Sequence, residues 1–186
     1  MIVSELNEQK RRNLLEAFHQ QNQDHVWYFT HRDNIPSIKE FGILSRNEVM
    51  RRGLDYRNYS DDAVQDARES LGIHDYVNFY FTWETTTRYA IWRDKPEYYD
   101  ELVFLRLSLE DLLTDDSITS FKFTNGNAGS MLTKTFTEAE DIERLPWDLI
   151  RAPSRAFTPS EGARRSSEVL VKPNVKIYPT TKWFVP

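Results

Sequence analysis

Two charged residues stand where the surrounding sequence predicts burial. Arg68 shares a helical stripe with Val64, Ala67 and Leu71, because these positions are spaced i, i+3, i+4 and i+7. Glu168 opens the otherwise apolar strand EVLVK. A buried guanidinium needs an anionic partner, and a carboxylate at the mouth of a strand can act in proton transfer. The structural alternatives are an internal ion pair or an edge arginine for the first residue, and a surface glutamate for the second.

A histidine and one strand face add further candidates. His31 follows a predicted strand over 26–30 and precedes a helix cap, a junction where ligands often meet backbone N–H groups. A lone histidine is nevertheless more often structural. The strand predicted over 76–81 alternates, and one of its faces is polar and aromatic: Tyr76, Asn78 and Tyr80. This face can contact a planar ligand, whereas the opposite face is predicted to be core.

Several familiar chemistries lack their motifs. The six glycines form neither GxGxxG nor GxxxxGK followed by Ser or Thr, so a Rossmann turn and a P-loop are excluded. Without cysteine there are no disulfides, thiolate zinc sites, iron–sulfur clusters or cysteine nucleophiles. The four histidines lack HExxH spacing, and no GxSxG is present. We therefore expect no metal, and any nucleotide must be held by another kind of site.

Length and composition indicate one globular domain over residues 1–186, with an N-terminal helix within 1–23 packed on it. The 186 residues are 39% hydrophobic and 13% aromatic, and no long apolar run or signal peptide is seen, so we expect a cytoplasmic protein without a membrane partner. The net charge of −5 argues against non-specific binding to duplex DNA. Residues 151–186 carry +5 and residues 1–150 carry −10, so we expect a substrate cleft in the basic C-terminal fifth.

Local patterns predict the elements that must position these side chains. The predicted helices cover 4–22 with Ser4 as cap, 33–42, 61 or 62–72, 85–92 and 138–145. The predicted strands cover 26–30, 76–81, 102–107, 120–124, 168–172 and 175–178, the last as hairpin partner of 168–172. Smaller basic groups, including Lys10–Arg12 and Arg46, are interpreted as solvated helix faces. Irregular connections and prolines near 153, 159, 173 and 179 favour a mixed α+β fold with antiparallel returns.

Five ordered segments resemble one protein family. WYFTHRDNIPSIKEFGILS (27–45), VQDAR (64–68), HDYVNFYF (74–81), FTNGNAGS (123–130) and SSEVLV (166–171) are similar to the DarT family of DNA ADP-ribosyltransferase toxins. The match spans about 145 residues, and the segments are specific in combination, although each alone is weak. The resemblance implies an ADP-ribosyltransferase-like fold, with a split and mainly antiparallel β-core that binds NAD in a cleft. It also implies transfer of ADP-ribose from NAD to a base in single-stranded DNA, by a toxin whose antitoxin removes the modification.

The resemblance assigns roles residue by residue. Glu168 corresponds to the catalytic glutamate and Arg68 to the catalytic arginine. The expected NAD-binding residues are Tyr28, Thr30, His31, Asn34 and Tyr80, and the expected DNA contacts are Thr87, Asn127 and Arg165. Cleavage of the nicotinamide bond builds positive charge on the ribose, which a carboxylate can stabilise while it also deprotonates the acceptor base. Arg68 can either hold the NAD pyrophosphate or polarise the base.

Three departures from the family pattern concern the substrates. Tyr28 stands where relatives often have histidine, residues 82–87 (TWETTT) replace a Pro-x-Ser-Pro-Met-like segment, and Asn127 stands where other members have histidine. The acceptor is guanosine or thymidine, and the altered loop favours guanosine. The alternatives are an ADP-ribosyltransferase that acts on RNA or protein, and an inactive module that binds nucleotide or nucleic acid.

Overall fold

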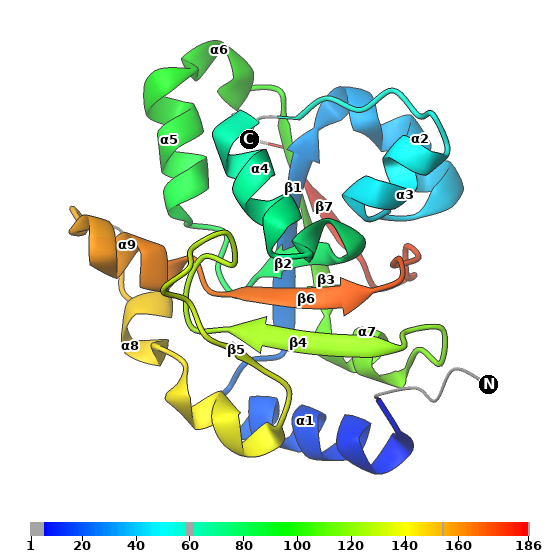
Figure 1. The fold of residues 1–186 in the computed structure, drawn as a ribbon, viewed down its shortest axis with the longest axis vertical. Helices are drawn as coiled ribbons and strands as arrows, with labels where there is room; N and C mark the ends of the chain where they lie inside the picture. Colours follow the sequence, from blue (N-terminus) through cyan, green and yellow to red (C-terminus); the bar gives the residue numbers. More distant parts are fainter. Residues whose placement is uncertain (1–5, 59–61, 154, 186) are drawn as a thin grey trace.

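An antiparallel sheet of seven strands forms the centre of the structure, which is a computed structural model (Figure 1). It describes residues 6–58, 62–153 and 155–185, without the side chains of 62–64. The strand order is β5-β4-β6-β2-β1-β3-β7. The strands are β1 (His25–His31), β2 (Val77–Tyr80), β3 (Leu102–Ser108), β4 (Ser120–Thr124), β5 (Thr135–Phe136), β6 (Glu168–Lys172) and β7 (Lys182–Phe184). The expected α+β class with antiparallel returns is confirmed.

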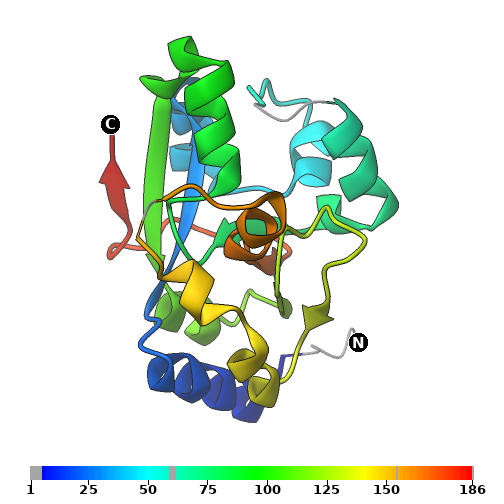
Figure 2. The same cartoon turned by 90° about the vertical axis from the view of Figure 1, so that its left-hand side faces the viewer.

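Short helices surround this sheet. The α-helices are α1 (Glu8–Gln20), α2 (Ile35–Phe41), α3 (Arg46–Arg51), α4 (Asp62–Ser70), α5 (Thr86–Asp94), α6 (Pro96–Tyr99), α7 (Leu109–Thr114), α8 (Trp147–Ile150) and α9 (Pro159–Arg165). Three 3₁₀ turns, η1 (Arg32–Asn34), η2 (Ile73–Asp75) and η3 (Ala139–Arg144), complete the described elements. Figure 2 shows α1 across the lower end of the sheet, and α3 and α4 on the side away from β7. Among the described residues, no helix combines the length and apolar character that a membrane crossing requires.

The sheet is split between β1 and β2. These strands pair at Trp27 and Tyr80, whereas β1 pairs with β3 along its whole length. Figure 1 shows β4 and β6 running across the view while β1 and β3 run up it, so the two halves of the sheet are strongly twisted against each other. Beyond the Trp27–Tyr80 pair, residues of both strands line one cavity. The split thus creates the space in which the candidate residues lie.

A large aromatic and aliphatic core fixes the lower half of the sheet. Leu14 and Phe18 of α1 are fully buried, and the Phe18 ring lies 5.7 Å from those of Phe81 and Phe123. The helix begins at Glu8 because the Asn7 carboxamide accepts a hydrogen bond from the backbone N–H of Lys10. The predicted cap Ser4 lies outside the described residues. Burial of these large side chains stabilises the platform that carries β4 and β6.

The prediction of a strand over 175–178 is wrong. Val175 forms only an isolated bridge with Ile43, and the final strand is β7, which pairs with β3. A hairpin with β6 cannot form because both edges of β6 are already occupied, by β2 on one side and β4 on the other. The segment 138–145, predicted as a helix, forms the 3₁₀ turn η3.

Several helices were not predicted. The structure shows α9 where the sequence analysis saw a proline break, because Pro159 occupies the first helical turn behind a capping box formed by Thr158 and Glu161. Ser45 and Ser108 cap the short helices α3 and α7 in the same way, each accepting a backbone N–H. Such helices are too short to show a clear apolar stripe.

Arg11 is not a solvated residue, contrary to the expectation for its basic group. Its guanidinium donates to the carbonyl oxygens of Leu113, Asp115 and Ile118, at 3.0, 2.9 and 2.5 Å. It therefore closes the C-terminal end of α7 and ties α1 to it.

We predict that Arg11→Ala lowers the free energy of unfolding by about 2 kcal/mol, because three carbonyls lose a charged donor. The matched control is Arg12→Ala, since Arg12 is exposed and forms a loose surface pair with Glu8; its effect should stay within about 0.5 kcal/mol. Urea denaturation measures both. Equal effects of the two substitutions would contradict this role of Arg11.

Candidate active site

Arg68 and Glu168 form a buried ion pair. The guanidinium donates to both carboxylate oxygens, with distances of 2.8 Å to Oε1 and 3.3 Å to Oε2. The Glu168 side chain is 0% exposed and that of Arg68 is 12% exposed. Burial alone would lower the pKa of Arg68, but the adjacent Glu168 carboxylate raises it above its ordinary value. The two residues singled out by the sequence patterns therefore meet.

Two further donors hold the Glu168 carboxylate. The backbone N–H of Ala128 donates to Oε1 and the Asn78 side chain donates to Oε2, each at 2.8 Å. The Glu168 backbone N–H donates to the hydroxyl of Thr124 at 2.9 Å. Both carboxylate oxygens are thus satisfied, which explains how a charged group can be fully buried.

Sheet register and helix position bring these groups together. Glu168 begins β6 and lies opposite Tyr80 of β2, so Asn78 is two residues along the same neighbouring strand. Arg68 comes from the last turn of α4. The loop that follows β4 supplies Ala128, and Gly129 in this loop approaches so closely that an added Cβ would lie 3.3 Å from Cγ of Arg68. The close approach explains why a residue without a side chain stands there.

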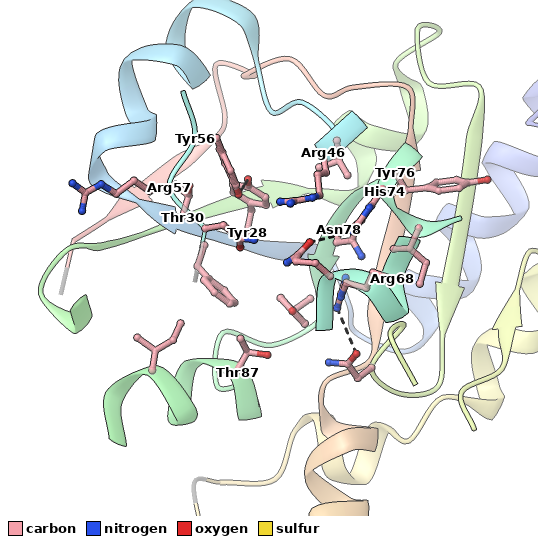
Figure 3. Close-up of a pocket in the computed structure, with 18 of the residues that line it drawn as sticks. Tyr28, Thr30, Arg46, Tyr56, Arg57, Arg68, His74, Tyr76, Asn78 and Thr87 are labelled. Atoms are coloured by element: carbon pink, nitrogen blue, oxygen red, sulfur yellow. Dashed lines mark hydrogen bonds between the residues drawn. The ribbon is translucent and has the colours of Figure 1, made fainter. Parts of the chain in front are cut away.

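A cavity of about 490 Å³ lies in front of the ion pair. Its charged lining residues are mainly cationic: Arg46, Arg57, Arg68 and Lys95, with Asp94 as the acidic one. Tyr28, Tyr56, Tyr76 and Tyr80 provide aromatic surface. In Figure 3, Arg46 projects into the cavity from one wall and Thr87 lies on the opposite side. The size, positive charge and aromatic walls suit a ligand that combines phosphates with planar rings.

Arg68 separates Glu168 from this cavity. Arg68 and Asn78 line the cavity, whereas Glu168 lies behind them. A substrate in the cavity therefore meets the guanidinium and the amide first. Direct contact with the carboxylate requires these two side chains to shift.

Thr30 and Asn34 are hydrogen-bonded to each other at the cavity wall. Asn34 is 3% exposed and donates to the Thr30 hydroxyl and to the carbonyl of Arg57, both at 2.9 Å. The side-chain oxygen Oδ1 of Asn34 accepts a hydrogen bond from the backbone N–H of Arg57 at 2.9 Å. Thr30 lines the cavity and Asn34 does not, so Asn34 positions the segment that carries Tyr56 and Arg57.

His31 is also buried behind the wall, with 2% exposure. Its Nδ1 accepts the backbone N–H of Asp33 at 3.0 Å, which places the proton on Nε2, and Nε2 lies 2.5 Å from the Glu101 carboxylate. His31 thus caps η1 and joins β1 to the segment before β3. The structure gives it a positioning role and no direct place in the cavity.

Tyr28 and Tyr80 face the cavity from the two strands on either side of the split. Burial, together with the nearby Glu168 charge, raises the pKa of Tyr80 to about 12, so its phenol is a neutral hydrogen-bond donor at physiological pH. Burial and the neighbouring Tyr56 phenol raise the pKa of Tyr28. The hydroxyls of Tyr28 and Tyr56 lie 3.5 Å apart.

The structure separates the three expected DNA contacts. Thr87 and Asn127 line the cavity, and Oδ1 of Asn127 accepts from Arg68 at 3.5 Å and from the Gly129 N–H at 2.9 Å. Arg165 is 3% exposed and is elsewhere. Its guanidinium donates to the Glu84 carboxylate and to the carbonyls of Glu84, Leu149 and Ala152. Arg165 is therefore unavailable to DNA in this structure, and instead joins α8, α9 and the segment before α5.

The cavity also differs from the expected basic C-terminal cleft. All of its described lining residues lie between Tyr28 and Asn127, so its cations come from the part of the chain that is acidic overall. Arg46 is therefore not the solvated helix residue that its sequence context predicts, and no local pattern singles out Tyr56. Arg46 begins α3, directly after the cap Ser45, and only the unpredicted helix reveals that it points inward.

We predict strong coupling between Arg68 and Glu168 in stability. Arg68→Ala should lower the free energy of unfolding by about 3 kcal/mol, because it leaves a buried carboxylate without its counter-charge. In the double variant Arg68→Ala with Glu168→Gln, most of this loss should be recovered. A double-mutant cycle in urea measures the coupling, and additive effects would contradict it.

Comparison with protein families gives one extensive match. Residues 27–179 match the family described as "ssDNA thymidine ADP-ribosyltransferase, DarT". The chain is 28% identical over 123 residues to a DNA ADP-ribosyl transferase–DNA ADP-ribosyl glycohydrolase fusion protein of Thermosipho africanus. This alignment covers 62% of the present chain and 30% of the fusion protein. The chain is 24% identical over 153 residues to a DNA ADP-ribosyl transferase of Escherichia coli O127:H6, covering 75% and 68%. The chain thus spans less than a third of the fusion protein.

Solved structures of Thermus sp. 2.9 DarT share the fold. Its complex with ADP-ribosylated single-stranded DNA matches with a TM-score of 0.69 at 23% identity, over 81% of this chain and 75% of that one. Its complex with NAD⁺ matches with a TM-score of 0.63 at 22% identity, over 80% and 75%. The split sheet, the buried Arg68–Glu168 pair and the family match over residues 27–179 together show that this chain belongs to the DarT family.

Proposed function

We propose that the protein transfers ADP-ribose from NAD to a base in single-stranded DNA. The observation that carries the proposal is the buried Arg68–Glu168 pair at the back of a cationic, aromatic cavity. Related proteins that bear the name DNA ADP-ribosyl transferase, and the NAD⁺ complex of Thermus DarT, support it.

The cavity fits NAD by its chemistry. Three arginines and a lysine can neutralise the pyrophosphate, and the tyrosines on both sides of the split offer flat surfaces for the two heterocycles. Within the described residues, no three His, Asp or Glu side chains are grouped as ligands for a metal ion. Arg46 and Arg57 line the cavity together with Tyr56 and are candidates for the phosphate contacts.

Glu168 supplies the charge that the reaction needs. The bond between nicotinamide and C1′ of the ribose breaks, nicotinamide leaves with the bonding electrons, and a bond forms between C1′ and the acceptor base. The base loses a proton in this step, and in the proposed mechanism the Glu168 carboxylate takes it once Arg68 has shifted. Before that, the same carboxylate stabilises the positive charge that develops on the ribose.

Arg68 has two tasks in this proposal. It orients the Glu168 carboxylate while the site is empty, through its two hydrogen bonds. When substrates fill the cavity, its guanidinium can pair with one of their anionic oxygens. The shift of Arg68 from the carboxylate to the substrate would expose Glu168 at the moment it is required.

We propose thymidine as the acceptor base, following the description of the matched family. The preference for guanosine rested on Asn127, and the structure shows this carboxamide engaged by Arg68 and the Gly129 N–H. A single-stranded substrate agrees with a site behind loops and helices, because an unpaired base reaches it without the cost of unstacking a duplex.

A glycohydrolase is the proposed partner. The Thermosipho relative joins a DNA ADP-ribosyl transferase and a DNA ADP-ribosyl glycohydrolase in one chain. We infer that this chain acts as a toxin in the cytoplasm, and that a glycohydrolase reverses its modification as antitoxin.

The test uses NAD and a set of single-stranded oligonucleotides, each lacking one base, with mass spectrometry of the DNA. We predict one added ADP-ribosyl group on every oligonucleotide that contains thymidine and none on the one without it. RNA of the same sequence and a mixture of proteins serve as competing acceptors. Modification of RNA or protein alone would replace the proposed acceptor, and no modification of any acceptor would refute the proposed activity.

Glu168→Gln should reduce the transfer rate at least about 100-fold, since the amide cannot accept the proton. The amide can still accept from Arg68 and Ala128, so the fold should persist. The control is Glu110→Gln on the exposed surface of α7, which should retain wild-type activity. Equal rates for wild type and Glu168→Gln would remove Glu168 from the mechanism.

A further inference from the structure

A second, smaller groove lies beside the active-site loop. Its volume is about 160 Å³, and its walls include Leu71, Tyr76, Lys122, Ser130 and Met131. Nothing in the function proposed above uses it. Its walls combine an aromatic ring, one lysine side chain and exposed apolar groups.

Two lysines flank the Tyr76 ring. The Nζ atoms of Lys122 and Lys172 lie 5.0 and 5.1 Å from the ring centroid. Lys172 also pairs with Asp75 at 3.1 Å, whereas Lys122 has no ion pair with a carboxylate among the residues that the structure describes. An aromatic face with adjacent cations is how proteins bind the bases and phosphates of single-stranded nucleic acid.

The rim of the groove is unusually apolar for exposed surface. Met131 is 92% exposed and Leu71 is 46% exposed. A flexible, polarisable methionine next to a tyrosine ring can pack against a planar group from its other side. Met131 and Leu71 thus give the groove an exposed apolar rim beside the Tyr76 ring.

The groove adjoins the active site directly. Ile73 and Tyr76 line both the groove and the large cavity. Ala128 lines the groove, and its N–H donates to Oε1 of Glu168 at 2.8 Å. Figure 3 shows the Tyr76 ring pointing away from Arg68. A polymeric ligand with one monomer near Glu168 would therefore reach the groove with its adjacent monomer.

We propose that this groove binds the nucleotide adjacent to the acceptor base in single-stranded DNA. The neighbouring base packs between Tyr76 and Met131, and its phosphate contacts Lys122. The inference rests on the proposed function and deepens it, because it assigns a second nucleotide subsite to the same enzyme. Positive charge next to an aromatic ring favours a nucleotide over an acidic peptide, which would engage the lysines but gain little from the ring.

The test compares Lys122→Ala with wild type, using NAD and a hexanucleotide with one thymidine. Lys122 lines the groove and is not among the residues of the large cavity, so its loss should raise KM for the hexanucleotide and leave kcat and KM for NAD unchanged. The slope of log kcat/KM against log salt concentration should fall in magnitude by about 0.7, the value of one phosphate contact to a single strand. The matched control is Lys182→Ala on β7, which should leave both quantities unchanged.

Tyr76 provides a second, independent test. Tyr76→Ala should raise KM for the hexanucleotide about tenfold, within the range of stacking by one base, whereas Tyr76→Phe keeps the ring and should retain most of the affinity. Suppose that the wild-type enzyme modifies the hexanucleotide, but KM for the hexanucleotide is the same in Lys122→Ala, Tyr76→Ala and the control Lys182→Ala. The subsite is then refuted and the proposed function stands. If poly-glutamate inhibits wild type more than Lys122→Ala while KM for DNA is unaffected, the groove binds acidic peptide and the inference is also refuted. No modification of DNA by wild type would refute the proposed function itself.

Discussion

A carboxylate buried without water is tolerated only while every oxygen is paired, and Glu168 imposes this constraint on the structure around it. Arg68, Asn78 and the Ala128 N–H satisfy it, and they come from α4, β2 and the loop after β4. These three segments are distant in sequence, so a single charged side chain fixes their relative positions. The close approach of Gly129 to Arg68 and the capping of Glu168 by Thr124 follow from the same requirement.

The split of the sheet creates the cavity in front of the buried Arg68–Glu168 pair. If β1 and β2 were paired along their whole length, Tyr28, Thr30, Asn78 and Tyr80 would not border one cavity. Supporting contacts hold the split open from behind: Asn34 fixes the segment at Arg57, and His31 joins β1 to Glu101. Asn34 and His31 are thus buried supports, and the residues in front of them line the cavity.

Local sequence patterns predicted the candidate site residues better than they predicted which segments of the chain contact one another. Helical periodicity placed Arg68 on a core-facing stripe, and strand alternation separated the face of Asn78 and Tyr80 from the core; both are properties of neighbouring residues. The partner of Arg68 and the burial of Arg165 depend on contacts between distant segments, which no local pattern contains. The false hairpin over 175–178 has the same origin, because β6 already had two neighbours. Arg46 escaped notice because the short helix that aims it lacks an apolar stripe.

Arg68 both pairs with Glu168 and stands between it and the cavity, so the proposed mechanism requires the pair to open when substrate binds. A crystal structure with a non-reactive NAD analogue tests this claim most directly. We expect the analogue in the large cavity, with the ribose carbon that bears nicotinamide next to Glu168 and the Arg68 guanidinium turned toward the ligand. An analogue bound elsewhere, or bound in the cavity while Glu168 remains fully covered by an unchanged Arg68, would contradict the account.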